Sequence, residues 1–421
     1  MKIKPTKLCQ HNFCVAFCNS ESIKMIKAAI LIALFSLPEL LLASDPSNPS
    51  LNLQGGSPSQ NPVCVGVPVS ASVSGSYSDP TSTNSEFAIT NHIWNWTAGI
   101  GGCSPTDGDG STTWTNTFNG PRTNVVVVTA TVRFQGYLGT NYWETSTNAS
   151  VTNTIIAVAI EKVQYQDCSG NWADIGNFKI PKGKSVSFKA IASPHGVPFP
   201  SGTPVWGGEA SGVGDTTTVT FNNTSSSDSD LKTIICGNCG ATVSYPNFLI
   251  CNTILDIIAT QATRNSYKHH GHAYINVSDL NAGTDISYGA YPLDFAGVTN
   301  YPQAAPGSCV RIGADPIGGL HIRHFLLAPS QTAALAQFIQ TPFAWHRWWN
   351  CATWASGAQP NDISALDWLP IPVFPYLLPL DTPRAIGASI DGLELTEPTT
   401  LIDPKYEQPV SCGWHGAGGS W

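Results

Sequence analysis

The chain has 421 residues, of which only 11% are charged, and its formal net charge is −8. This length exceeds what one hydrophobic core usually organises, so it predicts two to four domains. Lys and Arg are too few and too dispersed to neutralise phosphates, which excludes nucleic acid as a partner, and the abundance of Ser, Thr, Asn and Gly is typical of a β-rich exported protein.

The N-terminal segment has the pattern of an export signal. From Met25 the chain reads MIKAAILIALFSLPELLLAS, with a basic Lys27, an apolar core from Ala28 to Ala43 interrupted at positions 36, 38 and 39, and a small-residue exit. The pattern predicts a signal peptide over residues 1–43, with true initiation at Met25. The core is shorter than the roughly 20 residues of a membrane span, and no later stretch qualifies. We therefore expect a secreted protein, located outside the cell, at the cell surface or in the periplasm.

Two β-patterned regions follow a linker rich in Pro, Ser, Gly and Asn at residues 44–62. The first covers residues 63–158, and its strand candidates are 64–73, 92–97, 124–134 and 148–158. The second covers residues 159–252, and its strand candidates are IEKVQYQD, SVSFKAIAS, PVWGG, TTTVTF, LKTIIC and GATVSY. Alternating patterning between regularly spaced turn residues predicts an immunoglobulin-like β-sandwich for each region.

Strand and helix patterns are mixed in the third region, residues 262–400. We expect strands at 271–280, 285–291 and 320–327, a helix that begins near Pro329 with Ser330 as its N-cap, a short helix from Cys351, and a last helix capped by Thr382. Residues 401–421 form an irregular tail. The predicted fold class is therefore mainly β with a C-terminal α+β domain.

The cysteine count fits an oxidising compartment. Three of the twelve cysteines precede the apolar core of the signal, which leaves nine: Cys64, Cys103, Cys168, Cys236, Cys239, Cys251, Cys309, Cys351 and Cys412. Because nine is odd, at least one thiol has no internal disulfide partner, and we assign this role to Cys351. Cys64 and Cys103 could form a disulfide in the first region, and Cys309 and Cys412 one in the third, but the pairing of the eight remaining cysteines stays open.

Cys236-Gly-Asn-Cys239 lies between two strand candidates of the second region. It fits half of a zinc knuckle, a redox motif, or a hairpin turn with structural disulfides. A zinc site needs a second pair of ligands at similar spacing, and none is obvious. The structural interpretation is therefore favoured in an exported chain.

The candidate chemistry comes from a histidine that opens a strand and a cysteine that opens a helix. GHAYINVSDL carries His272 in its second position, and Asn350 directly precedes Cys351 in NCATWASGA. A thiol at the start of a helix is favoured as thiolate, and a nearby imidazole can accept its proton and later protonate the leaving group. This order predicts Cys351 as nucleophile and His272 as general base.

The segments GHAYINV, ISYGAYP and NCATWA resemble the circularly permuted papain-like hydrolases, relatives of the NlpC peptidases and the lecithin-retinol acyltransferases. The resemblance covers residues 262–395 and implies a permuted papain-like α+β domain. It implies that Cys351 is the nucleophile, His272 the base, and the backbone N–H of Cys351 part of an oxyanion hole. The strand after the base departs from the pattern, because it holds Ser287, Tyr288 and Tyr291 and no histidine. Tyr288 and His324 are the candidates for a third catalytic residue.

Metal binding is the main alternative for the histidines. His269, His270, His272, His321 and His324 cluster in sequence. However, the two histidines of HIRHF are three residues apart, which places them on opposite faces of a strand, and no carboxylate lies at a typical ligand spacing. We therefore predict neither a metal nor a cofactor, and we assign Trp345, Trp348 and Trp349 to core or groove wall.

Three functional hypotheses follow. The first is a secreted cysteine hydrolase that cleaves an amide or ester bond through the Cys351–His272 pair, with a peptide or acyl-bearing cell-envelope substrate; the resemblance implies peptidoglycan stem peptides. The second is a non-catalytic extracellular adhesion or cell-wall-binding protein with a degenerate hydrolase fold. The third is a disulfide-stapled matrix protein. The sequence does not indicate an oligomeric state.

Overall fold

The computed structural model describes residues 46–167, 170–260, 272–291, 310–313, 321–341, 343, 351–358, 366–370, 377–381 and 383–396. The predicted signal peptide, with the candidate initiation residues Met1 and Met25, and the C-terminal tail lie outside these residues. The described parts divide between two compact units, one within Met1–Asn52, Ser76–Trp94 and Thr131–Ala149, the other within Leu53–Gly75, Asn95–Ala130 and Ser150–Trp421. Each unit is considered by itself below.

The described residues are mainly β, as predicted. Their strands are β1 (Ser50–Gly55), β2 (Val63–Cys64), β3 (Pro68–Ser78), β4 (Phe87–Ala98), β5 (Gly102–Ser104), β6 (Ser111–Thr117), β7 (Arg122–Leu138), β8 (Asn141–Gln166), β9 (Trp172–Asp174), β10 (Phe178–Pro181), β11 (Ser185–Ser193), β12 (Val205–Gly208), β13 (Gly212–Val213), β14 (Thr216–Thr220), β15 (Lys232–Cys239), β16 (Ala241–Cys251), β17 (Thr253–Ala259), β18 (Ala273–Asp279), β19 (Thr284–Ala290), β20 (Val310–Ile312), β21 (His321–Leu327), β22 (Leu366–Pro370) and β23 (Leu377–Asp381). The helices are α2 (Pro329–Gln340), α3 (Cys351–Gly357) and α4 (Pro383–Thr396). None of these helices is long and apolar enough to cross a bilayer.

The first β region contains a four-stranded sheet in the order β1-β3-β6-β5, and strands β4 and β7 of a seven-stranded sheet. The part of the first β region that belongs to the larger unit has a core built around Trp96 and Trp114, which are both nearly fully buried. Their indole N–H groups donate to the carbonyls of Gly108 (2.9 Å) and Ile100 (2.7 Å), so neither polar tip is left unsatisfied. In the smaller unit the Tyr77 ring contacts the rings of His92, Trp94 and Phe134, with centroids 5.0–5.7 Å apart.

The second β region consists of two sheets over one core. Strands β14, β11 and β8 belong to the seven-stranded sheet, and β10-β16-β15-β12-β13 form a five-stranded sheet. The rings of Phe178, Phe188, Phe221 and Phe248 contact one another in this core. Strand β8 runs without interruption from Asn141 to Gln166, so the boundary expected at residue 158/159 falls inside a strand.

The disulfide of the described residues joins Cys64 in β2 to Cys239 at the end of β15. The Cys64–Cys103 bond that the sequence allowed is therefore not formed. Cys64 is the cross-strand partner of Val158 in β8 and belongs to the same buried core as Cys239. Cys103, in contrast, is a free thiol in the short strand β5. Cys168, Cys309 and Cys412 lie outside the described residues. Because Cys239 is oxidised, the Cys236/Cys239 motif has the structural role that the sequence favoured.

Two adjacent glycines of β12 provide a matched test of this region. Gly208 has φ +74°, and a Cβ there would lie 2.1 Å from the carbonyl oxygen of Thr233, whereas at Gly207 the nearest atom would be 3.7 Å away. Gly208→Ala is expected to lower the free energy of unfolding by about 2–4 kcal/mol, because it combines a disfavoured backbone with a clash. Gly207→Ala should change it by less than about 0.5 kcal/mol. Urea unfolding of both variants checks this difference, and equal effects would contradict it.

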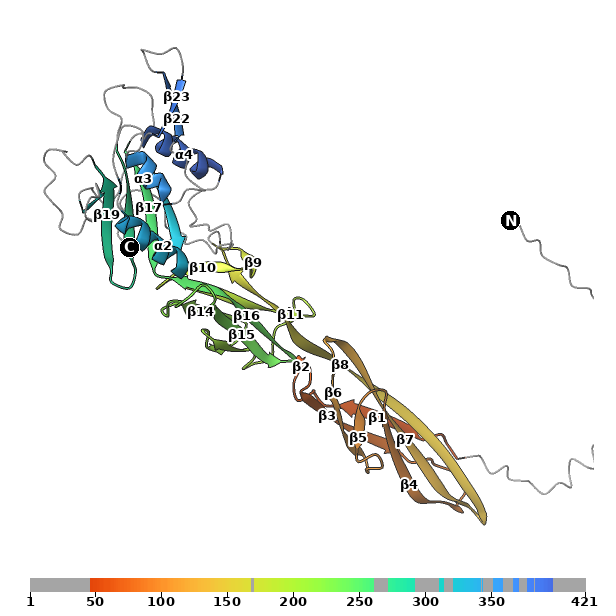
Figure 1. Ribbon diagram of the computed structural model, residues 1–421. Helices are drawn as coiled ribbons and strands as arrows, with labels where there is room; N and C mark the ends of the chain where they lie inside the picture. Colours follow the sequence, from red (N-terminus) through yellow and green to blue (C-terminus); the bar gives the residue numbers. More distant parts are fainter. Residues whose placement is uncertain are drawn as a thin grey trace, which may run out of the picture. The chain divides into compact units, whose positions relative to one another are not determined.

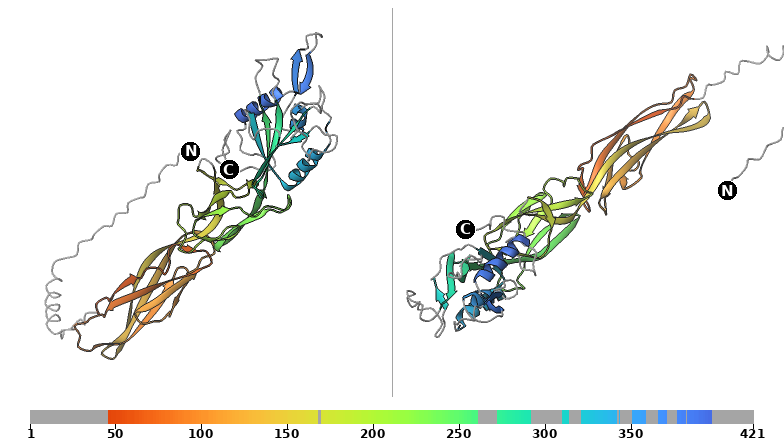
Figure 2. Two further views of the ribbon diagram at one scale, coloured as in Figure 1. Left: turned by 90° about the vertical axis from the view of Figure 1, so that its left-hand side faces the viewer. Right: turned by 90° about the horizontal axis from the view of Figure 1, so that it is seen from above.

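The third region is an antiparallel sheet in the order β20-β19-β18-β17-β21, with α2, α3 and α4 after its strands. The strands expected at 271–280, 285–291 and 320–327 are found as β18, β19 and β21. Figure 1 shows α3 beside α4, and both figures place the β22–β23 hairpin next to α4 (Figures 1 and 2). Ser330 does not cap α2 as expected. The N-cap is Ala328, whose N–H donates to the Gln331 side chain (2.9 Å), and Ser330 donates to Asp228 instead.

Candidate functional site

The central sheet of the third region has two chemically different faces. Side chains alternate along each strand, so one face carries an apolar set that packs with Leu335 of α2, Trp354 of α3 and Ile390 of α4. The strand residues of this set are Leu255, Ile257, Ala259, Ala273, Ile275, Ala290, Phe325 and Leu327. We call this the helix face. The intervening residues form the opposite face, which combines apolar side chains such as Ile254 and Leu326 with polar ones such as Asp256, Asn276 and His324.

Cys351 lies on the helix face. It is the first residue of α3, it is a half-exposed free thiol, and it packs against the helix-face core. Helix α3 contacts β18 and β19. Ala259, Ala273 and Ala290 are fully buried in this core, and their short side chains allow a helix to approach the sheet closely. The expectation that Cys351 opens a helix as an unpaired thiol therefore agrees with the structure.

His272 lies on the opposite face. It directly precedes β18, and its backbone N–H donates to the Thr260 hydroxyl (2.7 Å). Its ring contacts Tyr274 and the cross-strand residue Tyr291, with centroids 5.6 and 4.7 Å away. These residues alternate with Ala273 and Ala290 of the helix face. The structure thus does not bring His272 to the face that holds Cys351, and the pair stays a prediction that requires contact around the end of the sheet.

The two candidates for a third catalytic residue are also separated by the sheet. Tyr288 is paired with Ile275 and packs against the helix-face core, where burial raises the pKa of its phenol. His324 is on the opposite face, with its Nδ1 2.6 Å from Oδ1 of Asp256. Tyr288 therefore shares a face with Cys351, and His324 shares a face with His272.

A row of polar side chains crosses four strands of the opposite face. Ser287, Asn276, Asp256 and His324 are successive cross-strand partners, and Asn276 is only 2% exposed. The Asn276 amide nitrogen lies 3.5 Å from Oδ2 of Asp256. Asn276 Oδ1 has no hydrogen-bond partner among the described residues. The sequence carried a signal for this row, because AYINVSD alternates small or apolar residues with polar ones.

An imidazole held by a carboxylate also occurs on the helix face. His321 opens β21 opposite Ala259, and its Nδ1 lies 2.7 Å from Oδ1 of Asp391 on α4. Helix α4 packs on β21 and β17 and contacts α3. The carboxylate on Nδ1 leaves Nε2 as the ring nitrogen that can accept a proton. Sequence reasoning considered His321 only as a metal ligand and did not single out Asp391, which lies 70 residues away.

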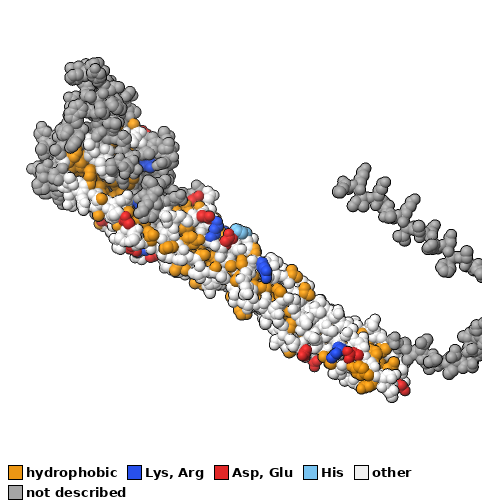
Figure 3. Space-filling model, turned by 45° about the vertical axis from the view of Figure 1, so that its right-hand side comes forward, with side chains coloured by type: hydrophobic (Ala, Val, Ile, Leu, Met, Phe, Trp, Pro, Cys, Tyr) orange, Lys and Arg blue, Asp and Glu red, His pale blue; other side chains and the backbone are white. Residues whose placement is uncertain are grey.

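The described residues contain no group of three or more His, Cys, Asp or Glu side chains that could hold a metal ion. His321 and His324 lie on opposite faces, as their spacing predicted. His269, His270 and the three tryptophans at 345, 348 and 349 fall outside the described residues. Among the described residues on the face shown in Figure 3, Lys and Arg side chains are scattered and several adjoin carboxylates, so these residues form no basic patch for a polyanion.

Comparison with known proteins adds no assignment. No protein-family model matches the sequence, and no curated protein is similar to it at a significant level.

Proposed function

We propose that this chain is an exported cysteine hydrolase in which Cys351 attacks an amide or ester carbonyl. The observation that carries the proposal is a half-exposed free thiol on the same sheet face as an imidazole oriented by a carboxylate, His321 with Asp391. In this proposal two immunoglobulin-like sandwiches precede a permuted papain-like domain. The resemblance suggests a cell-envelope peptide as substrate.

The chemistry needs only groups of this chain and water. An imidazole removes the Cys351 proton, and the sulfur forms a bond to the carbonyl carbon. As the tetrahedral intermediate collapses, the carbon–leaving group bond breaks and the imidazolium protonates the departing amine or alcohol. Water, deprotonated by the same imidazole, then cleaves the thioester, which releases the acid and regenerates the thiol.

The base in this proposal is His321, because it shares the helix face with Cys351 and because Asp391 holds its Nδ1. His272, which the resemblance implies, is the alternative and has the Tyr274 and Tyr291 rings as its neighbours. The two assignments predict different variants to be inactive.

His321→Gln is expected to lower kcat/KM at least about 100-fold, the usual contribution of a general base, whereas His272→Gln should lower it by less than about threefold. Asp391→Asn should reduce kcat more than it changes KM, because it disturbs the tautomer of the ring and not substrate binding. The measurement is hydrolysis of p-nitrophenyl acetate and of peptidoglycan fragments by the purified chain. Loss of activity only in His272→Gln would assign the base to His272 and contradict the His321 assignment.

A non-catalytic wall-binding function is the second candidate, and the position of His272 on the face opposite Cys351 favours it. In this case the chain co-sediments with purified peptidoglycan sacculi, and Cys351→Ala binds equally well. The two candidates are distinguished by turnover: a binding protein shows sedimentation without release of soluble products.

A further inference from the structure

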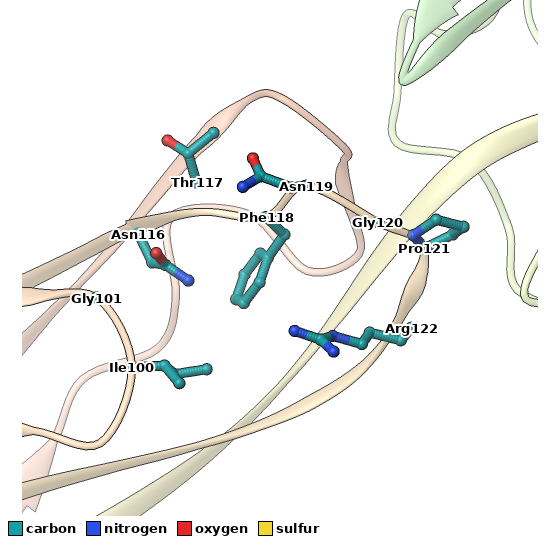
Figure 4. A pocket seen from close by; sticks show the side chains of 9 residues that line it. All are labelled: Ile100, Gly101, Asn116, Thr117, Phe118, Asn119, Gly120, Pro121 and Arg122. Carbon is teal, nitrogen blue, oxygen red and sulfur yellow. The ribbon is translucent and has the colours of Figure 1, made fainter.

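The larger unit contains an open cavity that is far from the C-terminal domain in sequence. It lies in the first β region, between the β4–β5 connection and the β6–β7 connection, and has a volume of about 560 Å³. Its lining includes Ile100, Asn116, Phe118 and Arg122. Figure 4 shows the Arg122 guanidinium pointing from the start of β7 toward Ile100 and Phe118, and the Asn116 amide directed to the same space.

The wall formed by the β4–β5 connection is fixed by the core beneath it. The Ile100 carbonyl accepts the indole N–H of Trp114 at 2.7 Å, and Trp114 is fully buried. Gly101 follows with φ +77°, and a Cβ there would lie 2.4 Å from the Thr115 carbonyl oxygen. Only glycine allows this close approach of the connection to β6. The cavity is therefore bounded by backbone that has little freedom to move.

The cation of the cavity is also held in place. The Arg122 Nε donates to Oδ1 of Asn124 at 2.9 Å, and the Asn124 amide donates back to the Arg122 carbonyl at 3.0 Å. Asn124 is only 5% exposed, so a buried side chain orients the guanidinium. Because Nε already donates to Asn124, the two terminal guanidinium nitrogens, which face the cavity, are the ones that can bind a ligand.

We propose that this cavity binds a saccharide that carries a carboxylate. The terminal nitrogens of a guanidinium match the two oxygens of a carboxylate, and the Asn116 amide offers both a donor and an acceptor for sugar hydroxyls. The apolar part of the lining consists of Ile100, Pro121 and the largely buried Phe118, which is too small a surface for an acyl chain. Arg122 is the one cation among the nine lining residues, which matches one negative charge and not a polyanion.

The test compares glucuronate with glucose, which differ only at C6, by isothermal titration and saturation-transfer NMR on the purified full chain. Glucuronate should bind, and glucose should bind at least about tenfold more weakly. A charge-assisted hydrogen bond contributes more binding free energy than a tenfold difference in Kd requires. Arg122→Gln should remove this preference, and Asn116→Ala should weaken glucuronate binding while keeping the preference. Arg133→Gln is the matched control, because Arg133 lies elsewhere on β7, outside the cavity lining, and forms an ion pair with Glu144 of β8.

Three outcomes would overturn the proposal: no glucuronate binding at tens of millimolar, equal binding of glucose, or displacement of glucuronate by an equal concentration of inorganic phosphate. The last result would mark a general anion site. Unfolding curves of the variants show whether a loss of binding reflects a loss of fold. None of these results depends on Cys351, so hydrolase activity and the cavity can fail separately.

Discussion

Cys351→Ala is expected to reduce hydrolysis to the uncatalysed background, a loss of at least about 10³-fold, because no other group replaces a covalent nucleophile. The fold should survive, since the side chain is small and only partly buried. The measurement is turnover of p-nitrophenyl acetate together with the free energy of unfolding. The variant should keep its unfolding midpoint while losing turnover.

The other described cysteines outside the Cys64–Cys239 disulfide provide the control for this experiment. Cys236 and Cys251 are buried, so p-nitrophenyl acetate should not reach their sulfur atoms in the folded chain. Cys103 is partly exposed, but burial raises its pKa and so disfavours its thiolate. Cys103→Ala should therefore retain full turnover. Unchanged turnover in Cys351→Ala, or equal loss in both variants, would contradict a nucleophilic role for Cys351.

Removal of the Cys64–Cys239 disulfide should have the largest effect on stability. The bond closes a segment of 175 residues, and native disulfides that close long loops contribute about 2–5 kcal/mol, largely by restricting the unfolded chain. The double variant Cys64→Ala/Cys239→Ala should lose this amount in urea unfolding. Hydrolysis measured well below the unfolding midpoint should stay unchanged.

Cys236 decides the design of that experiment. It lies three residues before Cys239, and burial raises its pKa to about 12. At neutral pH it is therefore almost entirely thiol, which cannot attack the neighbouring disulfide. A single Cys64→Ala variant would free Cys239 to pair with Cys236 during folding, so the double variant is the clean comparison. A double variant as stable as the parent chain would contradict the assigned contribution.

The strands were predictable where alternation was strict. The segment 124–134 lies within β7, where buried and exposed residues alternate as its sequence indicates. No strand end marks the expected boundary at 158/159, because β8 stays β-patterned throughout and contains no glycine or proline. The Cys64–Cys239 pairing could not be read from spacing, since nine cysteines allow many connectivities.

In the candidate site, too, some features could be predicted from the sequence and others could not. The sequence correctly placed Cys351 at the start of a helix, and it placed His321 and His324 on opposite faces. The face of His272 was also readable, because His272, Tyr274 and Asn276 alternate with the apolar Ala273, Ile275 and Val277. What the sequence could not supply was the approach of α4 to β21, which joins Asp391 to His321.

Trapping of the acyl-enzyme shows whether Cys351 is the nucleophile. The native chain is mixed briefly with p-nitrophenyl acetate, quenched in acid and digested, and the peptides are analysed by mass spectrometry. We expect an acetyl group on the sulfur of Cys351, both in the parent chain and in Cys103→Ala. An unmodified Cys351, or a Cys351 found in a disulfide with another cysteine, would contradict it.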